Sequence, residues 1–104
     1  MDLSGQAKKA ELDIDSYKSL LATFVGATDR DLARLEQAVK EGDTPTAAGL
    51  AHHIKGAAAN LELEEIRAAA LCAELAGKAG NLAEVAPQVA IMTARLEEIR
   101  AALE

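Results

Sequence analysis

Aromatic residues are almost absent from this chain of 104 residues, which has one Tyr, one Phe and no Trp. Positive charge is also scarce, because 11 Lys and Arg face 17 Asp and Glu and leave a formal net charge of −6. Nucleic-acid binding usually needs a Lys- or Arg-rich surface together with stacking aromatic rings. The composition therefore predicts no nucleic-acid partner, and the same lack of positive charge argues against an anionic membrane surface.

Long apolar runs and paired cysteines are missing as well. No run reaches the roughly 18 residues that cross a bilayer, and the first residues, MDLSGQAKKAELDID, lack the apolar segment of a secretory signal. Cys72 is the one cysteine, so no disulfide can form within the chain. We therefore expect a cytoplasmic protein with no membrane association, in which Cys72 is a packed small residue.

The apolar half of the composition comes mainly from Ala and Leu, which are strong helix formers. A chain of this length forms one domain with one modest core. Its helical patterns are joined by short loops, which imply antiparallel neighbours. We predict an all-α fold, an antiparallel up-and-down four-helix bundle over residues 13–104. Residues 1–12 form a short N-terminal extension, of which residues 1–11 are predicted to be a frayed tail or a loosely docked turn.

The first predicted helix runs from Asp15 to about Lys40. Apolar residues recur at intervals of three and four along it, which is typical of an amphipathic helix. Gly26 and the sequence Thr28-x-x-Asp31 leave open a break into two helices. The apolar pattern keeps its phase through that point, which favours one long helix.

The other helices follow from their start and stop signals. A second helix is predicted from Thr44, as N-cap, and Pro45 to about Leu61, after a stop at Gly42. A third begins near residue 63 and ends by 77–80, and the last begins near Pro87. The third helix has two competing apolar faces, and the sequence leaves open which one points inward: Leu71, Cys72 and Leu75, or Ile66, Ala69, Ala70 and Ala73.

His52 stands on the outer face of the second predicted helix. At 100° per residue, the core stripe lies on the opposite side of that helix, at Leu50, Ile54, Ala57 and Leu61. Four of the neighbours of His52 on its own face are tiny: Ala48, Gly49, Gly56 and Ala59. Glycine inside a helix costs about 1 kcal/mol relative to Ala, so two glycines on one face indicate room for a partner to approach.

The residues beside His52 suggest nucleophilic chemistry. A neutral imidazole can form a covalent intermediate, and Lys55, one turn along, can neutralise oxygens of a phosphoryl group on the ring. From geometry alone, an alternative stays open. His52 would then be an ordinary surface histidine, and Gly49 and Gly56 would sit at close helix contacts.

The segment Ala51-His-His-Ile-Lys-Gly-Ala-Ala-Ala-Asn-Leu61 resembles the signature of histidine-containing phosphotransfer (HPt) domains, A-H-x-[LI]-K-G-[SA]-[SA]-A-N-[LI]. The resemblance covers roughly residues 13–103. It implies that His52 is the phosphorylated nucleophile, that Lys55 supplies charge and that Gly56 gives clearance. His53 falls on a variable position and is expected to be a partly covered polar residue.

Two positions need comment under this resemblance. The family usually has Gly where this chain has Glu62, so we expect the turn there to be built differently. Glu74 matches a position where an acidic or amide residue can orient the imidazole, the alternative being a solvated surface carboxylate. The resemblance also implies a docking surface around His52, formed by Ala48, Gly49 and Ala59 with Leu20 and Phe24 from the preceding helix.

The function implied by the resemblance is that of a phosphocarrier and not of an enzyme. The phosphoryl group would come from an aspartate of a response-regulator receiver domain, for instance in a hybrid sensor histidine kinase, and pass to another receiver. The chain itself would bind no cofactor or metal, with Mg²⁺ held by the receiver, and would act as a monomer. Two alternatives remain: a phosphoacceptor domain of a chemotaxis-type histidine kinase, and a helical adaptor that is not phosphorylated.

Overall fold

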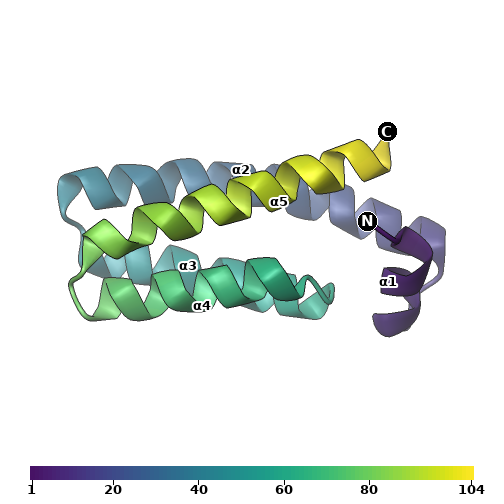
Figure 1. Ribbon diagram of the computed structural model, residues 1–104, viewed down its shortest axis with the longest axis horizontal. Helices are drawn as coiled ribbons and strands as arrows, with labels where there is room; N and C mark the ends of the chain where they lie inside the picture. The colour runs from purple at the N-terminus through teal and green to yellow at the C-terminus, as the bar shows by residue number, and fades with distance from the viewer.

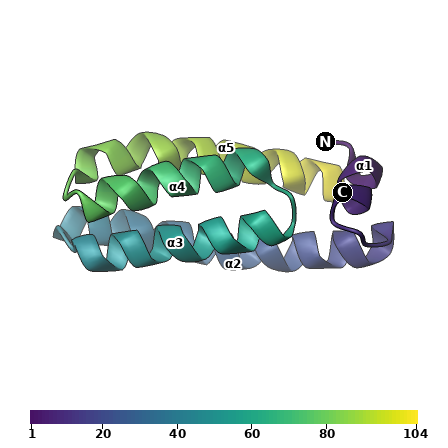
Figure 2. The ribbon, with the colours of Figure 1, turned by 90° about the horizontal axis from the view of Figure 1, so that it is seen from below.

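The computed structural model describes residues 1–104 and is helical throughout, which confirms the all-α prediction. Four long helices lie along one axis (Figures 1 and 2), and the short helix α1 lies at the end where both termini are found. The elements are, in chain order, α1 (Leu3–Lys9), α2 (Ile14–Glu41), α3 (Thr44–Asn60), α4 (Glu64–Lys78), a 3₁₀ turn η1 (Leu82–Glu84) and α5 (Val85–Leu103).

Contacts between helices show that chain neighbours run in opposite directions. The Tyr17 hydroxyl at the start of α2 donates to the Leu61 carbonyl at the end of α3, at 2.5 Å. Gly77 near the end of α4 lies against Ala48 near the start of α3. Each long helix packs on the next, and α5 closes the bundle against α2. The arrangement is that of an up-and-down bundle.

Helix α2 is a single helix of 28 residues, as the apolar pattern predicted. The Asp13 side chain accepts a hydrogen bond from the Ser16 backbone N–H at 2.8 Å and so caps the start. Gly42 ends the helix in the left-handed conformation, at φ 69°. Gly26 and Thr28 lie inside it without a break, and Thr28 is buried in the bundle.

Helix α4 turns its alanine face inward, which settles the choice that the sequence left open. Its buried apolar residues are Ile66, Ala69, Ala70, Ala73 and Ala76. Leu75 on the other face is 57% exposed. Cys72 is exposed too, so the prediction of a packed cysteine is wrong. Small side chains on the inner face let α4 approach α3 closely, which the larger Leu75 would prevent.

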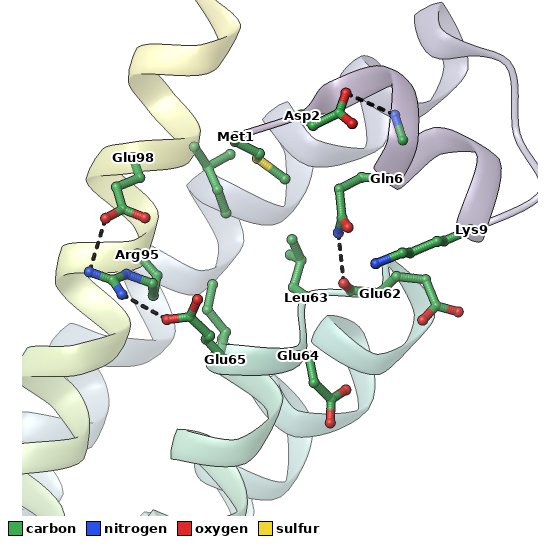
Figure 3. A pocket seen from close by; sticks show the side chains of 13 residues that line it. Met1, Asp2, Gln6, Lys9, Glu62, Leu63, Glu64, Glu65, Arg95 and Glu98 are labelled. Atoms are coloured by element: carbon green, nitrogen blue, oxygen red, sulfur yellow. Dashed lines mark hydrogen bonds and ion pairs between the residues drawn. The ribbon is translucent and has the colours of Figure 1, made fainter.

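Residues 1–11 were predicted as a frayed tail or loosely docked turn, and this is wrong for most of the segment. Residues Leu3–Lys9 form helix α1, capped by Asp2, and Ala7 is buried against the bundle. The Gln6 side-chain amide donates to the Glu62 carbonyl at 2.7 Å and ties α1 to the turn between α3 and α4 (Figure 3). The division of the chain after residue 12 stays a prediction.

The last helix begins at Val85, two residues before the predicted start at Pro87. Proline is tolerated there because N–H groups in the first turn have no partner within the helix. The buried positions of α5 recur at intervals of three and four residues: Val85, Val89, Met92, Leu96 and Ile99. These side chains belong to the hydrophobic core, where α5 packs against α2 and α4.

Candidate functional site

Helix α3 presents His52 outward while its opposite side is buried. Leu50, Ile54 and Ala58 lie in the core. The cap of this helix is Asp43, and not the predicted Thr44, since the Asp43 carboxylate accepts from the Thr46 backbone N–H at 3.2 Å. The His52 side chain is 67% exposed. The ring therefore stands on the outer face of the helix and is largely exposed to solvent.

Glu74 of α4 lies directly beside His52. Its Oε2 is 2.8 Å from His52 Nδ1, and its side chain is only 4% exposed. The alternative of a solvated surface carboxylate is therefore wrong. The carboxylate is thus buried in the seam between α3 and α4 and lies within hydrogen-bonding distance of the imidazole ring.

Two ammonium groups also bind this carboxylate. Lys55 Nζ lies 2.7 Å from Glu74 Oε1, and Lys78 Nζ lies 3.2 Å from Glu74 Oε2. The hydrogen bond from Lys55, helped by those from Lys78 and His52, overcomes the effect of burial and lowers the pKa of Glu74 from 4.5 to about 2. Glu74 is thus ionised and can only accept hydrogen bonds. His52 Nδ1 must therefore be the donor, and in the neutral ring Nε2 keeps the free lone pair.

The two glycines on the outer face of α3 have open space around them. A Cβ added to Gly49 or to Gly56 would meet no atom within 4 Å outside its own helix segment. The alternative that these glycines sit at close helix contacts is therefore wrong. The close contact in this part of the bundle is made by Gly77, where a Cβ would lie 3.1 Å from the Ala48 backbone nitrogen.

Only part of the predicted docking surface is accessible. Gly49 and Ala59 are exposed on α3, and Leu20 is 45% exposed on α2. Ala48 and Phe24 are buried and cannot contact a partner, which corrects the prediction for both. Ala48 is covered by Gly77 of α4, whereas Phe24 belongs to the hydrophobic core.

His53 differs from its prediction as a partly covered residue, because its side chain is 68% exposed. Its Nδ1 lies 2.9 Å from Asp31 Oδ2 of α2. Neither this pairing nor the contact of Lys78 with Glu74 was predicted from the sequence. The spacing of four between Glu74 and Lys78 is the signal that would have found the lysine. No comparable spacing signal links His53 to Asp31, since they belong to different helices.

The hollow lined by α1, α4 and α5 does not belong to this site. It has a volume of about 410 Å³ and lies at the bundle end, between α1 and the start of α4 (Figure 3). Arg95 crosses one side of it and pairs with Glu65 and Glu98. None of the residues around His52 lines this hollow. The site on α3 is therefore an open surface, suited to a macromolecular partner more than to an enclosed small ligand.

Comparisons with known proteins give one match. A family model described as Hpt domain matches residues 19–102, which include the whole of α3 and α4. No curated protein and no solved structure gives a significant match. None of the helices has the length and apolar character needed to cross a membrane, and no three His, Cys, Asp or Glu side chains converge as a metal site would require.

Proposed function

The chain belongs to the Hpt domain family, and on that premise we propose that His52 takes a phosphoryl group from a receiver-domain aspartate and passes it to another receiver. Hpt domains are phosphocarrier modules of two-component phosphorelays, not enzymes in the usual sense. The proposal adds to this the reacting residue and the direction of transfer. It also places the chain in the cytoplasm, as a monomer that meets a hybrid sensor histidine kinase and response-regulator receivers.

The contact between His52 and Glu74 carries the proposal. A nucleophilic imidazole needs a free lone pair on an accessible nitrogen. An ionised Glu74 at 2.8 Å from Nδ1 favours the tautomer with the proton on Nδ1 and the lone pair on Nε2. Because Glu74 is buried, the ring is held in this orientation before a partner arrives. Such preorganisation lowers the entropic cost of reaching the reacting geometry.

The transfer step follows from these groups. Nε2 of His52 attacks the phosphorus atom, the N–P bond forms, and the P–O bond to the receiver aspartate breaks. The aspartate leaves as a carboxylate with the electron pair of that bond. The phosphorylated ring keeps its Nδ1 proton and becomes cationic, and the adjacent Glu74 carboxylate offsets that charge. Transfer to the next receiver is the reverse of this step.

Lys55 supplies positive charge beside the phosphoryl oxygens. One of its three N–H donors is used by Glu74, which leaves two for the phosphoryl group. The open surface at Gly49 and Gly56 lets the receiver bring its aspartate close to the ring. Charge neutralisation dominates phosphoryl transfer, and the proposal assigns the Mg²⁺ that contributes to it to the receiver.

The first experiment follows radiolabel from a panel of phosphorylated receivers, and from a kinase catalytic domain with ATP, to the wild type and to His52→Gln. We expect acid-labile, alkali-stable label that forms at least about tenfold faster on the wild type than on the variant, because the variant lacks the proposed nucleophile. Equal labelling of both proteins would sink the proposal. Label from the kinase domain alone would favour the chemotaxis-type alternative. No label on a folded wild type would favour the adaptor.

A further inference from the structure

His53 repeats, on the other side of α3, the arrangement found at His52. Its Nδ1 lies 2.9 Å from a carboxylate oxygen of Asp31, against 2.8 Å from His52 to Glu74. The two imidazoles are equally open to solvent. One ring is bound toward α4 and the other toward α2, so the adjacent histidines diverge.

The second oxygen of each carboxylate also faces a cation. Glu74 Oε1 binds Lys55, and Asp31 Oδ1 lies 3.9 Å from Arg34 Nη1. The Arg34 side chain is largely exposed, so its guanidinium can turn toward an anion beside His53. A guanidinium binds phosphate oxygens in a bidentate manner. A histidine, a carboxylate and a cation therefore occur together twice, once on each flank of α3.

The open strip formed by Gly49 and Gly56 serves both histidines. At 100° per residue, the two glycines lie about 60° and 40° round the helix from His52, in the direction of His53 at about 100°. The cleared surface is thus centred between the two rings, and nothing fills it. A donor that approaches along the strip passes both imidazoles.

We propose that His53 is a second phosphoryl acceptor, with Asp31 holding its ring and Arg34 binding the phosphoryl oxygens. This inference rests on the proposed function of His52, because it uses the same donor and the same strip. An ionised Asp31 accepts the Nδ1 proton and leaves the lone pair on Nε2 of His53. Nε2 attacks phosphorus, and the P–O bond to the acyl group of the donor breaks. The donor carboxylate takes the electron pair, and the ring keeps its Nδ1 proton.

The differences between the two groups make His53 the weaker acceptor. Asp31 is more exposed than Glu74, and Arg34 is farther from its carboxylate than Lys55 is. A more exposed carboxylate stabilises the cationic phosphorylated ring less, because water screens the interaction. His53 is therefore expected to be phosphorylated about tenfold more slowly than His52.

The test uses phosphoramidate as the probe, because this small donor does not need the surface on which a receiver domain docks. Its P–N bond breaks on transfer, and ammonia leaves. Intact mass at neutral pH counts the phosphoryl groups on each protein. We expect two groups on the wild type, one on His52→Gln, one on His53→Gln and none on the double variant. In the His52→Gln background, Asp31→Asn and Arg34→Gln should each slow labelling about tenfold. Glu65→Gln in that background changes an exposed carboxylate outside both histidine groups, so it is the matched control and should not slow labelling.

Each contrary result has a separate meaning. Label on His53→Gln but none on a folded His52→Gln would overturn the second acceptor and leave the proposed function intact. Label on His52→Gln that neither Asp31→Asn nor Arg34→Gln slows would overturn it too, since His53 would then react like any exposed imidazole. No label even on the wild type would count against both proposals. Circular dichroism of every variant checks that it is folded.

Discussion

The two sides of helix α3 use small residues in opposite ways. On the inner side, Ala48 lies so close to Gly77 that a Cβ on the glycine would come within 3.1–3.3 Å of three Ala48 atoms. On the outer side, Gly49 and Gly56 have nothing within 4 Å of the same position. The inner contact brings two helices together, whereas the outer glycines leave a surface empty.

Small residues on the inner side therefore affect the stability of the bundle, whereas those on the outer side affect how closely a partner can approach. A side chain added inside must push α4 away from α3, while one added outside meets only solvent or a partner. Glu74 belongs to both sides, because it is buried in the seam and also contacts His52. Variants on the inner side should therefore lower the free energy of unfolding, variants outside should lower transfer without lowering stability, and Glu74 variants should lower both.

The largest effect on stability is expected for Glu74→Gln. The pKa of Glu74 is about 2 in the folded protein and 4.5 where the carboxyl has no partners, as in the unfolded chain. Ionisation of Glu74 therefore favours folding. That contribution is fully present above pH 4.5 and is lost as the pH falls toward 2. Ionised Glu74 contributes at most about 3 kcal/mol to the free energy of unfolding. Urea unfolding across this pH range should show a wild-type loss of stability on acidification that the variant shows much less.

Glu65→Gln is the matched control on the same helix. Glu65 pairs with Arg95 at 2.7 Å, but its side chain is exposed to solvent. Exposed ion pairs contribute less than about 1 kcal/mol. If Glu65→Gln and Glu74→Gln lost the same stability at neutral pH, burial of the carboxylate in the α3–α4 seam would not be what makes Glu74 important.

A smaller loss is expected for Gly77→Ala. Forcing an extra methyl group into a packed interface costs about 1–3 kcal/mol, and the better helix propensity of Ala returns up to about 1 kcal/mol. We expect a net loss of about 1–2 kcal/mol in urea unfolding, because the nearest atoms are the Ala48 backbone and cannot rotate away. A stability equal to or above that of the wild type would mean that the two helices separate at little cost.

Gly49→Ala and Gly56→Ala should raise the free energy of unfolding, in contrast to Gly77→Ala. Each removes a glycine from a helix interior and should raise stability by about 0.5–1 kcal/mol. Each also adds a methyl group to the open strip, so transfer from a receiver should fall while labelling by phosphoramidate is retained. Thermal unfolding and the two labelling rates measure these effects. Unchanged transfer from the receiver in both variants would show that the strip is not used for approach.

Much of this arrangement could be predicted from local sequence patterns. The phase of the apolar pattern gave a single helix α2, and the spacing around His52 placed it opposite the core of α3. The open surface at Gly49 and Gly56 was also expected. These features depend on residues within one helix, where a period of 3.6 relates sequence to position directly.

Features that depend on two helices could not be read in the same way. The Ala-rich inward face of α4 could not be chosen, because both of its faces carry apolar residues. The choice buries Glu74, exposes Cys72 and determines which residues can reach His52. The pairing of His53 with Asp31 requires the register between α2 and α3, which no local pattern supplies. Helix α1 was missed because seven residues carry too short a periodic signal.

The smallest effect is expected at a turn where glycine is absent. The turns after α2 and α4 place Gly42 and Gly80 at φ 69° and 74°, and the turn after α3 places Glu62 at φ 59°. Glu62 thus takes the left-handed conformation that Gly42 and Gly80 take, although it is not glycine. Its carbonyl accepts from Gln6, and the preceding carbonyl accepts from Tyr17, so the turn is held from outside.

Glu62→Gly should therefore stabilise the bundle slightly. It removes a left-handed penalty of about 1–2 kcal/mol but adds freedom to the unfolded chain, which costs about 0.5–1 kcal/mol. A net gain of about 0.5 kcal/mol is expected in urea unfolding, with no change in labelling of His52. Glu62→Ala is the matched control, because it removes the same charge but keeps the Cβ, and it should give no gain. A gain as large in Glu62→Ala would assign the effect to the negative charge of Glu62 and not to its backbone conformation.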